Sequence, residues 1–153
     1  MTHEDIEPYL AAVRAKDRDE ILAEIERSEV DPEAFGVFVI EVDQARAGTM
    51  RFERANQRSR IASLGGLAIH PDFRGRKISD QAARLFQRHL LGDLGFHRLQ
   101  LEICGFNERA IKHAERSGFT REGVRRKAYW RNDEWVDGVL YGLVAEDLGD
   151  EDD

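Results

Sequence analysis

The sequence predicts a mixed α/β fold whose sheet has six to seven mostly antiparallel strands, with helices on both faces. Two pairs of β-branched and aromatic runs, each separated by a short polar stretch, are typical of antiparallel hairpins. Between them lies a strand, helix, strand unit, residues 61–104, whose strands should form a central parallel pair through a right-handed crossover. A chain of 153 residues can bury one core, so we expect a single domain over 1–148 and an acidic tail over 149–153.

The first part of the chain is expected to form helices and three strands. Residues 8–29 place apolar side chains at helical spacing, with a break near 17–19 that predicts two short helices. Phe35–Val42 (FGVFVIEV) and Gly48–Arg54 (GTMRFER) are predicted as the first hairpin. Ile61–Ile69 (IASLGGLAI) is the third strand, and its glycine pair indicates a bulge or the close approach of another backbone.

A long amphipathic helix and a half-buried strand follow. From Ile78 onward apolar residues recur at helical spacing, and either Gly92 or Gly95 should end the helix. In Leu99–Ile103 apolar and polar residues alternate, which predicts a strand with one face buried.

The last part of the chain predicts a short helix and a second hairpin. Asn107 is suited to cap the helix, and Gly118 to end it in a left-handed conformation. Val124–Trp130 and Trp135–Leu143 read as strands joined by the polar turn at 131–134.

Composition narrows the function classes. Cys104 is the one cysteine, which excludes an internal disulfide and indicates a reducing compartment. No apolar run is long enough to cross a bilayer, and the start MTHEDIEPYL lacks the pattern of a signal peptide, so we expect a cytoplasmic protein with no membrane partner. The formal charge is −7, of which residues 150–153 carry −4 and the rest −3. This acidic balance argues against nucleic acid and is compatible with a cationic substrate. The five histidines lack metal-ligand spacing, so no metal is expected.

The stretch IHPDFRGRKISDQ, residues 69–81, has the layout of an anion-binding helix start. A strand-like run breaks at Pro71, passes through a basic loop with one glycine and enters a helical pattern. Backbone N–H groups and the positive end of a helix together attract phosphate. The alternative is that the basic residues form only a solvated turn.

Three segments closely resemble the GCN5-related N-acetyltransferase (GNAT) superfamily, above all its branch that acetylates ribosomal protein N-termini and polyamines. They are LAIHPDFRGR, FHRLQLEICGFNERAIKHAERSGF and REGVRRKAYWRNDEWVDGVLYGL, in the family's order and spacing. The resemblance implies an acyl-CoA N-acyltransferase fold in which the central parallel strands splay apart. It also implies that the pantetheine arm of acetyl-CoA lies in the gap, with its pyrophosphate on the helix start. The family uses the N-terminal third for substrate binding, and homodimers are frequent in it.

The resemblance implies a set of residues that bind coenzyme A. Asn107 has a second explanation as a helix cap. The implied contacts are Leu67, Ala68, Ile69, Arg74, Gly75, Arg76, Lys77, Ile78, Ser79, Asn107 and Ala110.

The chain departs from the family pattern at the loop and at the general acid. Lys77 and Ser79 stand where the family has small residues, and a side chain there can obstruct a phosphate unless it points away. Weakened but retained CoA binding is the preferred interpretation, with Lys77 as an added phosphate contact. Ala114 stands where a tyrosine often supplies the acid, and the adjacent His113 lies about 100° round the helix.

Two carboxylates are candidates for the general base. Glu102 lies on the second parallel strand, and Asp137 opens the last strand. Each has the alternative of being a surface carboxylate or an ion-pair partner of a nearby arginine, and deprotonation through water is also open. Cys104 is better explained as a small packed residue than as an acyl carrier.

The sequence therefore predicts an enzyme that transfers acetyl from acetyl-CoA to a primary amine of a peptide, polyamine, amino acid or other small molecule. Residues 48–64 and the strands after Gly123 are expected to shape the acceptor pocket. The alternatives are a non-catalytic acyl-CoA-binding or sensing module and an acyltransferase for a different acyl group.

Overall fold

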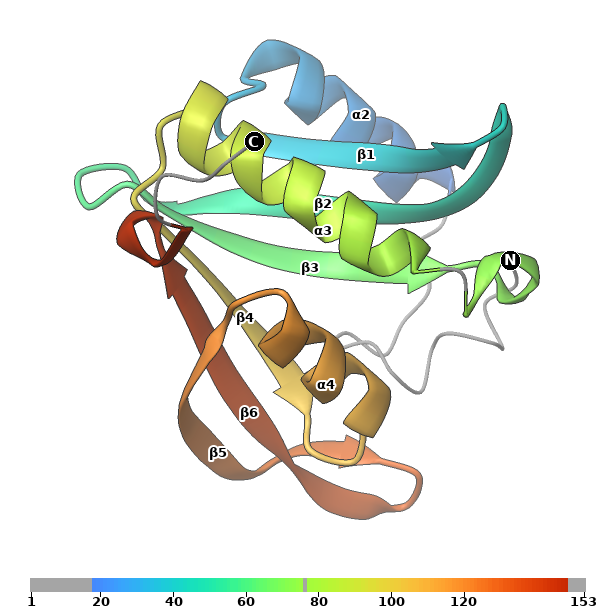
Figure 1. The fold of residues 1–153 in the computed structure, drawn as a ribbon, viewed down its shortest axis with the longest axis vertical. Helices are drawn as coiled ribbons and strands as arrows, with labels where there is room; N and C mark the ends of the chain where they lie inside the picture. Colours follow the sequence, from blue (N-terminus) through green and yellow to red (C-terminus); the bar gives the residue numbers. More distant parts are fainter. Residues whose placement is uncertain (1–17, 76, 149–153) are drawn as a thin grey trace.

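The computed structural model describes residues 18–75 and 77–148, and these residues form a mixed sheet with helices on both faces (Figure 1). The first of the two predicted N-terminal helices and the acidic tail lie outside the described residues. The strands are β1 (Phe35–Val42), β2 (Ala45–Asn56), β3 (Ile61–Ile69), β4 (Arg98–Cys104), β5 (Thr120–Arg131) and β6 (Glu134–Val144). The α-helices are α2 (Arg18–Val30), α3 (Ile78–Gln87) and α4 (Glu108–Arg116).

The six described strands form one sheet in the order β1-β2-β3-β4-β6-β5. Neighbours pair antiparallel except for β3 and β4, which are parallel. The predicted fold class is confirmed. Both hairpins are longer than the sequence indicated, because β2, β5 and β6 extend beyond the apolar runs that predicted them.

Two-residue turns close both hairpins. Val42 pairs with Ala45 across Asp43 and Gln44, and Arg131 pairs with Glu134 across Asn132 and Asp133. All four turn residues have positive φ values between 51° and 70°. Positive φ at both central residues gives the turn whose twist matches that of a hairpin.

The helices cover the two faces of the sheet unequally. In Figure 1, α3 and α4 lie in front of the sheet and α2 lies behind β1 and β2. The α3 helix continues as a π-helical stretch over Arg88–Asp93, and the chain then turns at Gly95, whose φ is 75°. The predicted ends of α4 are confirmed, since Asn107 caps it and Gly118 follows it with a φ of 98°.

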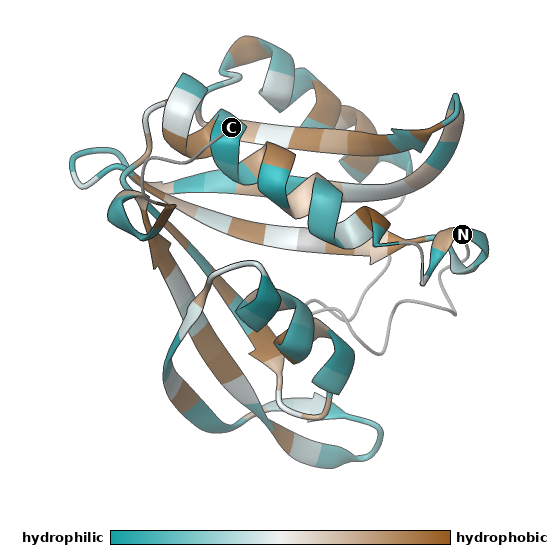
Figure 2. Ribbon diagram, in the orientation of Figure 1, coloured by the Kyte–Doolittle hydropathy of each residue, from teal (hydrophilic) through white to brown (hydrophobic). Residues whose placement is uncertain are grey.

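The core lies between the sheet and the pair α3 and α4. Figure 2 shows hydrophobic residues along the strands and mainly hydrophilic residues on α4. The largest fully buried side chains are Phe52, Leu90, Leu99, Tyr141 and Leu143. One core cluster joins residues of β2, β3, α3, β4, α4 and β6, so both halves of the sheet share it.

The parallel pair is short, and this positions the site. Ile61, Ala62 and Ser63 pair with β4, and the pairing ends there. Leu64–Ile69 of β3 and Leu101–Cys104 of β4 then diverge, as Figure 1 shows. We call these two stretches the splayed segments. The predicted splaying is confirmed, and so is the bulge, because the β2–β3 register shifts between Gly65 and Ala68.

Candidate active site

The splayed segment of β3 presents backbone groups toward the gap. His70 N–H donates to the Ala47 carbonyl of β2 at 2.7 Å, and Ala68 is paired with Thr49. Because alternate residues of an antiparallel strand bond to the same neighbour, the backbone groups of Ile69 point away from β2, whereas Leu67 lies in the register shift between Gly65 and Ala68. The Ile69 carbonyl accepts a hydrogen bond from Arg74 Nε at 3.1 Å.

The turn that leads into α3 keeps the backbone conformation of a glycine-containing loop although Lys77 replaces a small residue. Lys77 is exposed and has a φ of 60° and a ψ of 19°, which is the left-handed region that glycine adopts without strain. Gly75 also has a positive φ, 83°, with open space where a Cβ would stand. The predicted Arg76 contact lies outside the described residues. Lys77 therefore adopts, with a side chain, the left-handed conformation that glycine adopts without strain.

The first turn of α3 supplies backbone donors next to this loop. The Gln81 N–H donates to the Lys77 carbonyl at 3.2 Å, which begins the helical ladder. The N–H groups of Ile78, Ser79 and Asp80 belong to the first turn, where a helix has no carbonyl to bond them. Ile78 is buried and anchors this end of the helix against the protein.

The start of α4 lies after the splayed end of β4. Asn107 is buried, and its Oδ1 accepts a hydrogen bond from Ala110 N–H at 3.2 Å. This hydrogen bond shows that Asn107 caps α4, which is its structural role. Ala114 is 3% exposed and packs in the core, so the position that often holds the family's tyrosine faces the protein interior here.

Glu102 is held by a tyrosine from the far edge of the sheet. Tyr129 OH donates to Glu102 Oε1 at 2.7 Å, and Arg125 Nε lies 3.8 Å from Oε2. Burial and the Glu102 carboxylate both raise the pKa of Tyr129. The Glu102 side chain is 18% exposed, and its Oε2 has no hydrogen-bond partner within the described part of the chain.

Gly138 leaves room for the contact between Tyr129 and Glu102, which are 27 residues apart in the chain. A Cβ at Gly138 would collide with Glu102 Oε2 and with the Tyr129 ring. The carboxylate can therefore lean across β6 only because the strand has a glycine there.

Asp137 has a structural contact instead. It is exposed, and its Oδ1 accepts a hydrogen bond from Lys127 N–H at 2.8 Å. Lys127 has a φ of 48° and lies where the β5–β6 register shifts, so the carboxylate secures an irregular segment of β5. The structure does not bring Asp137 and Glu102 into one hydrogen-bonded pair.

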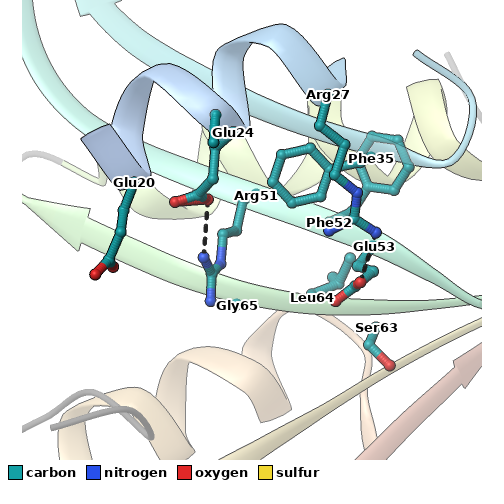
Figure 3. Close-up of a pocket in the computed structure, with 11 residues that line it drawn as sticks. Glu20, Glu24, Arg27, Phe35, Arg51, Phe52, Glu53, Ser63, Leu64 and Gly65 are labelled. Atoms are coloured by element: carbon teal, nitrogen blue, oxygen red, sulfur yellow. Dashed lines mark hydrogen bonds and ion pairs between the residues drawn. The ribbon is translucent and has the colours of Figure 1, made fainter. Parts of the chain in front are cut away.

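A pocket of about 410 Å³ opens on the α2 side of the sheet (Figure 3). Arg51 reaches Glu24 at 3.2 Å, and Arg27 reaches Glu53 at 2.7 Å. The pocket ends at β3 where the parallel pairing ends. Its lining residues are Glu20, Ala23, Glu24, Arg27, Phe35, Arg51, Phe52, Glu53, Ser63, Leu64 and Gly65.

On the opposite face, a polar cluster connects α3 and α4. Asp80 accepts hydrogen bonds from His113 Nδ1 at 2.9 Å and from Arg116 at 3.0 Å. The Arg116 contact, followed by the one from His113, lowers the pKa of Asp80. Burial lowers the pKa of His113, against the opposing effect of Asp80. An ionised Asp80 has no proton to give, so His113 Nδ1 carries the hydrogen of their bond.

The sequence located several parts of this region but not the contacts that connect them. The splayed segment of β3, the turn and Asn107 lie where they were expected. The Tyr129–Glu102 contact and the Asp80 cluster were missed, because they join residues far apart in the chain. Apolar alternation in the strands placed Glu102 on a face, but no local pattern marks its partner.

The part of the chain that the structure describes contains no group of three or more His, Cys, Asp or Glu side chains that could hold a metal ion. None of its helices is long and apolar enough to cross a membrane.

Comparisons with known proteins agree with this geometry. The family model of the acetyltransferase (GNAT) family matches residues 1–119. An uncharacterized N-acetyltransferase of Bacillus subtilis, YokL, is 25% identical over 82 residues, which cover 54% of this chain and 46% of the relative. The spermidine N(1)-acetyltransferase of Escherichia coli is 25% identical over 133 residues, which cover 87% of this chain and 67% of the relative. The chain thus spans less than half of the first relative and about two thirds of the second.

A solved structure shares the fold at low identity. The ribosomal L7/L12 α-N-protein acetyltransferase RimL, in complex with coenzyme A, superposes with a TM-score of 0.81 at 18% identity. The match covers 93% of this chain and 81% of RimL. At this identity the likeness establishes the fold alone.

The left-handed conformation of Lys77 predicts that glycine is tolerated there. This region costs a residue with a Cβ about 1–2 kcal/mol, and the freedom of glycine in the unfolded chain offsets about 0.5–1 kcal/mol. Lys77→Gly should therefore raise the free energy of unfolding by about 0.5–1 kcal/mol in urea denaturation. Arg84→Gly, at an exposed right-handed position of α3, should lower it by about 1 kcal/mol. Equal losses in the two variants would contradict the assigned backbone conformation.

The lowered pKa of His113 predicts a pH-dependent stability. The unfolded chain takes up a proton near the ordinary His pKa of 6.5, whereas the folded chain resists it until a lower pH. Stability is therefore full above this ordinary pKa and falls as the pH drops through it toward the folded pKa. His113→Gln should reduce the loss of Tm between about pH 7.5 and about pH 5.5. Lys112→Gln, at the exposed neighbouring position, should leave the loss unchanged, and an unchanged loss in His113→Gln as well would refute the assignment.

Proposed function

Because the chain belongs to the acetyltransferase (GNAT) family, we propose that it transfers the acetyl group of acetyl-CoA to a primary amine. The observation that carries this proposal is the unpaired edge of β3 leading into the turn at the start of α3. An extended tether can add to such an edge as an extra strand, and a phosphate can bind the adjacent helix start. Acetyl-CoA contains both chemical groups in one molecule.

The residues present fit coenzyme A. The backbone groups of Leu67 and Ile69 would bind the pantetheine amides, and Asn107 and Ala110 would line the other side. Ala68, whose backbone is paired with Thr49, would contribute only its buried methyl group. The pyrophosphate would be held at the turn by basic side chains and by the backbone of Gly75 and the first turn of α3. The residues proposed for the pyrophosphate are Arg74, Gly75, Arg76, Lys77, Ile78 and Ser79.

The thioester supplies an electrophilic acyl carbon and a thiolate leaving group. Toward this chemistry, one backbone N–H of the splayed segment of β3 is suited to donate to the acyl oxygen as negative charge develops on it. The amine must lose its ammonium proton before it can attack. We assign this proton to Glu102, a carboxylate of the splayed segment of β4 whose Oε1 is fixed by Tyr129 and whose Oε2 is buried without a hydrogen-bond partner in the described chain. Asp137 remains the alternative base.

The acceptor is proposed to bind in the pocket beside α2. Ser63, Leu64 and Gly65 line its end, and Gly65 belongs to the splayed segment. Three carboxylates and two guanidinium groups line the pocket, an excess of negative charge that favours an ammonium group. The relatives named for spermidine and for a protein N-terminus act on amines, which supports this class of acceptor.

The proposed function is tested by binding and turnover with matched variants. Calorimetry should detect coenzyme A binding, and acetyl-CoA should release free thiol with some member of a panel of polyamines, amino acids and peptides. Glu102→Gln should lower kcat about 100-fold with little change in CoA affinity, since it removes a base without changing the turn. Asp137→Asn keeps an oxygen for the Lys127 N–H and should retain kcat within about threefold.

Each outcome has a distinct meaning. Absence of CoA binding by the wild-type chain would refute the proposal. Intact binding without turnover on any acceptor would favour the non-catalytic CoA-binding alternative, and a larger kcat loss in Asp137→Asn than in Glu102→Gln would reverse the base assignment.

A further inference from the structure

Few backbone pairs join the two halves of the molecule beside the splayed segments. One half contains α2, β1, β2, β3 and α3, and the other contains β4, α4, β5 and β6. Three residue pairs join β3 to β4. At that closed end, on the face away from α3 and α4, Gln100 Nε2 donates to Ser63 Oγ at 3.1 Å. Because this joint is short, contacts elsewhere must set the angle between the two halves.

Side-chain hydrogen bonds between α3 and α4 supply such contacts on the helical face. Gln87 Nε2 donates to the Ser117 carbonyl at 3.0 Å, near the ends of both helices. Asp80 connects to His113 and Arg116 from the first turn of α3. Among these bonds, the Asp80 contacts lie nearest to the proposed phosphate turn, because Asp80 is three residues after Lys77.

The Asp80 contacts have the properties of a fixed connection. The side chain of His113 is 13% exposed and that of Asp80 is 31% exposed, so solvent screens their bond only partly. Asp80 Oδ1 accepts from both His113 Nδ1 and Arg116, and Oδ2 receives a further bond from Arg116 Nε at 3.3 Å. Two residues of α4, almost one turn apart, thus bind one carboxylate of α3.

The position of the Asp80 carboxylate disfavours the binding of an anion at the turn. Asp80 places a negative charge in the first helical turn, where the phosphate of coenzyme A is proposed to bind, and like charges repel. Arg116 lies 3.0 Å from Asp80, which partly neutralises the charge of the carboxylate and lowers its pKa. If this carboxylate had no role in coenzyme A binding beyond its charge, its removal would strengthen that binding.

We propose that Asp80 is a positioning residue that ties α4 to the first turn of α3 and thereby fixes the width of the gap that receives coenzyme A. This inference rests on the proposed function. Without the connection, the shared core, the Gln87–Ser117 bond and the joint at Ile61–Ser63 would still hold the two halves together, but no contact beside the turn would hold it at a fixed separation from Asn107. Misplacement of binding groups by about 1 Å can cost about 100-fold in an enzyme, so a loss of about tenfold in CoA affinity is expected here.

Loss of positioning and loss of charge repulsion should change the Kd for coenzyme A in opposite directions, so one substitution at Asp80 can tell them apart. In Asp80→Ala, which removes both carboxylate oxygens, the positioning account predicts a Kd for coenzyme A about tenfold higher, whereas loss of charge repulsion alone predicts a lower Kd. Asp72→Ala is the matched control, because Asp72 is an exposed carboxylate of the same loop that makes no contact with α4 in the described structure. Its Kd should equal that of the wild-type chain or be lower.

A second variant, at Arg116, keeps the test valid if the Asp80 variant fails to fold. Arg116 is 53% exposed, so Arg116→Met should fold, and it should also raise the Kd. In the double variant Asp80→Ala/Arg116→Met the two effects should be less than multiplicative, because both break one connection. Asp80→Glu should restore part of the affinity. The affinities are measured by calorimetry well below the Tm of each variant.

The outcomes separate this inference from the proposed function. A wild-type chain that binds coenzyme A, together with an Asp80→Ala variant that binds as tightly or more tightly, would overturn the positioning role alone. A wild-type chain that fails to bind coenzyme A would overturn both proposals. Multiplicative effects in the double variant would show that Asp80 and Arg116 act separately, which would also contradict the connection.

Discussion

The short parallel contact between β3 and β4 is the constraint on which the rest of this structure depends. Three paired residues, Ile61–Ser63, hold the centre of the sheet together, and beyond them the strands diverge. Divergence deprives the β3 backbone of a partner, and backbone groups without partners are costly unless water or a ligand bonds them. The bulge near Gly65 and the turn at Lys77 then direct the free edge toward the start of α3. A buried core shared by both halves supplies the stability that the missing pairing does not.

The sequence predicted the elements well because their signals are local. Alternation and β-branched residues located β1 and β3, and capping residues located α4. The glycine pair in β3 predicted the bulge that the register shift confirms. Local patterns could not reveal the splaying, which entered only through the resemblance to a family. Register between strands is decided by packing over the whole core, and no single residue of β3 or β4 encodes it.

The site residues were harder to predict for the same physical reason. Glu102 meets Tyr129 because Gly138 leaves room across β6, so the contact depends on three strands at once. The sequence placed His113 about 100° round the helix from Ala114 but could not name its partner, which is Asp80, 33 residues away. Lys77 shows that a departure from the family's sequence pattern need not change the local backbone structure. A residue that departs from the family pattern still adopts the backbone conformation that the pattern encodes, at a modest cost in strain.

The central claim is that coenzyme A pairs with the free edge of β3, and amide hydrogen exchange with and without coenzyme A tests it most directly. Strand alternation assigns the amide of Ile69 to the gap and that of Ala68 to β2, and the proposed pairing also uses Leu67, which lies in the bulge. Coenzyme A should therefore slow exchange at Leu67 and Ile69 and at Ile78 and Ser79 of α3, with little effect at Ala68. Unchanged exchange at Leu67 and Ile69 under saturating coenzyme A would contradict the account.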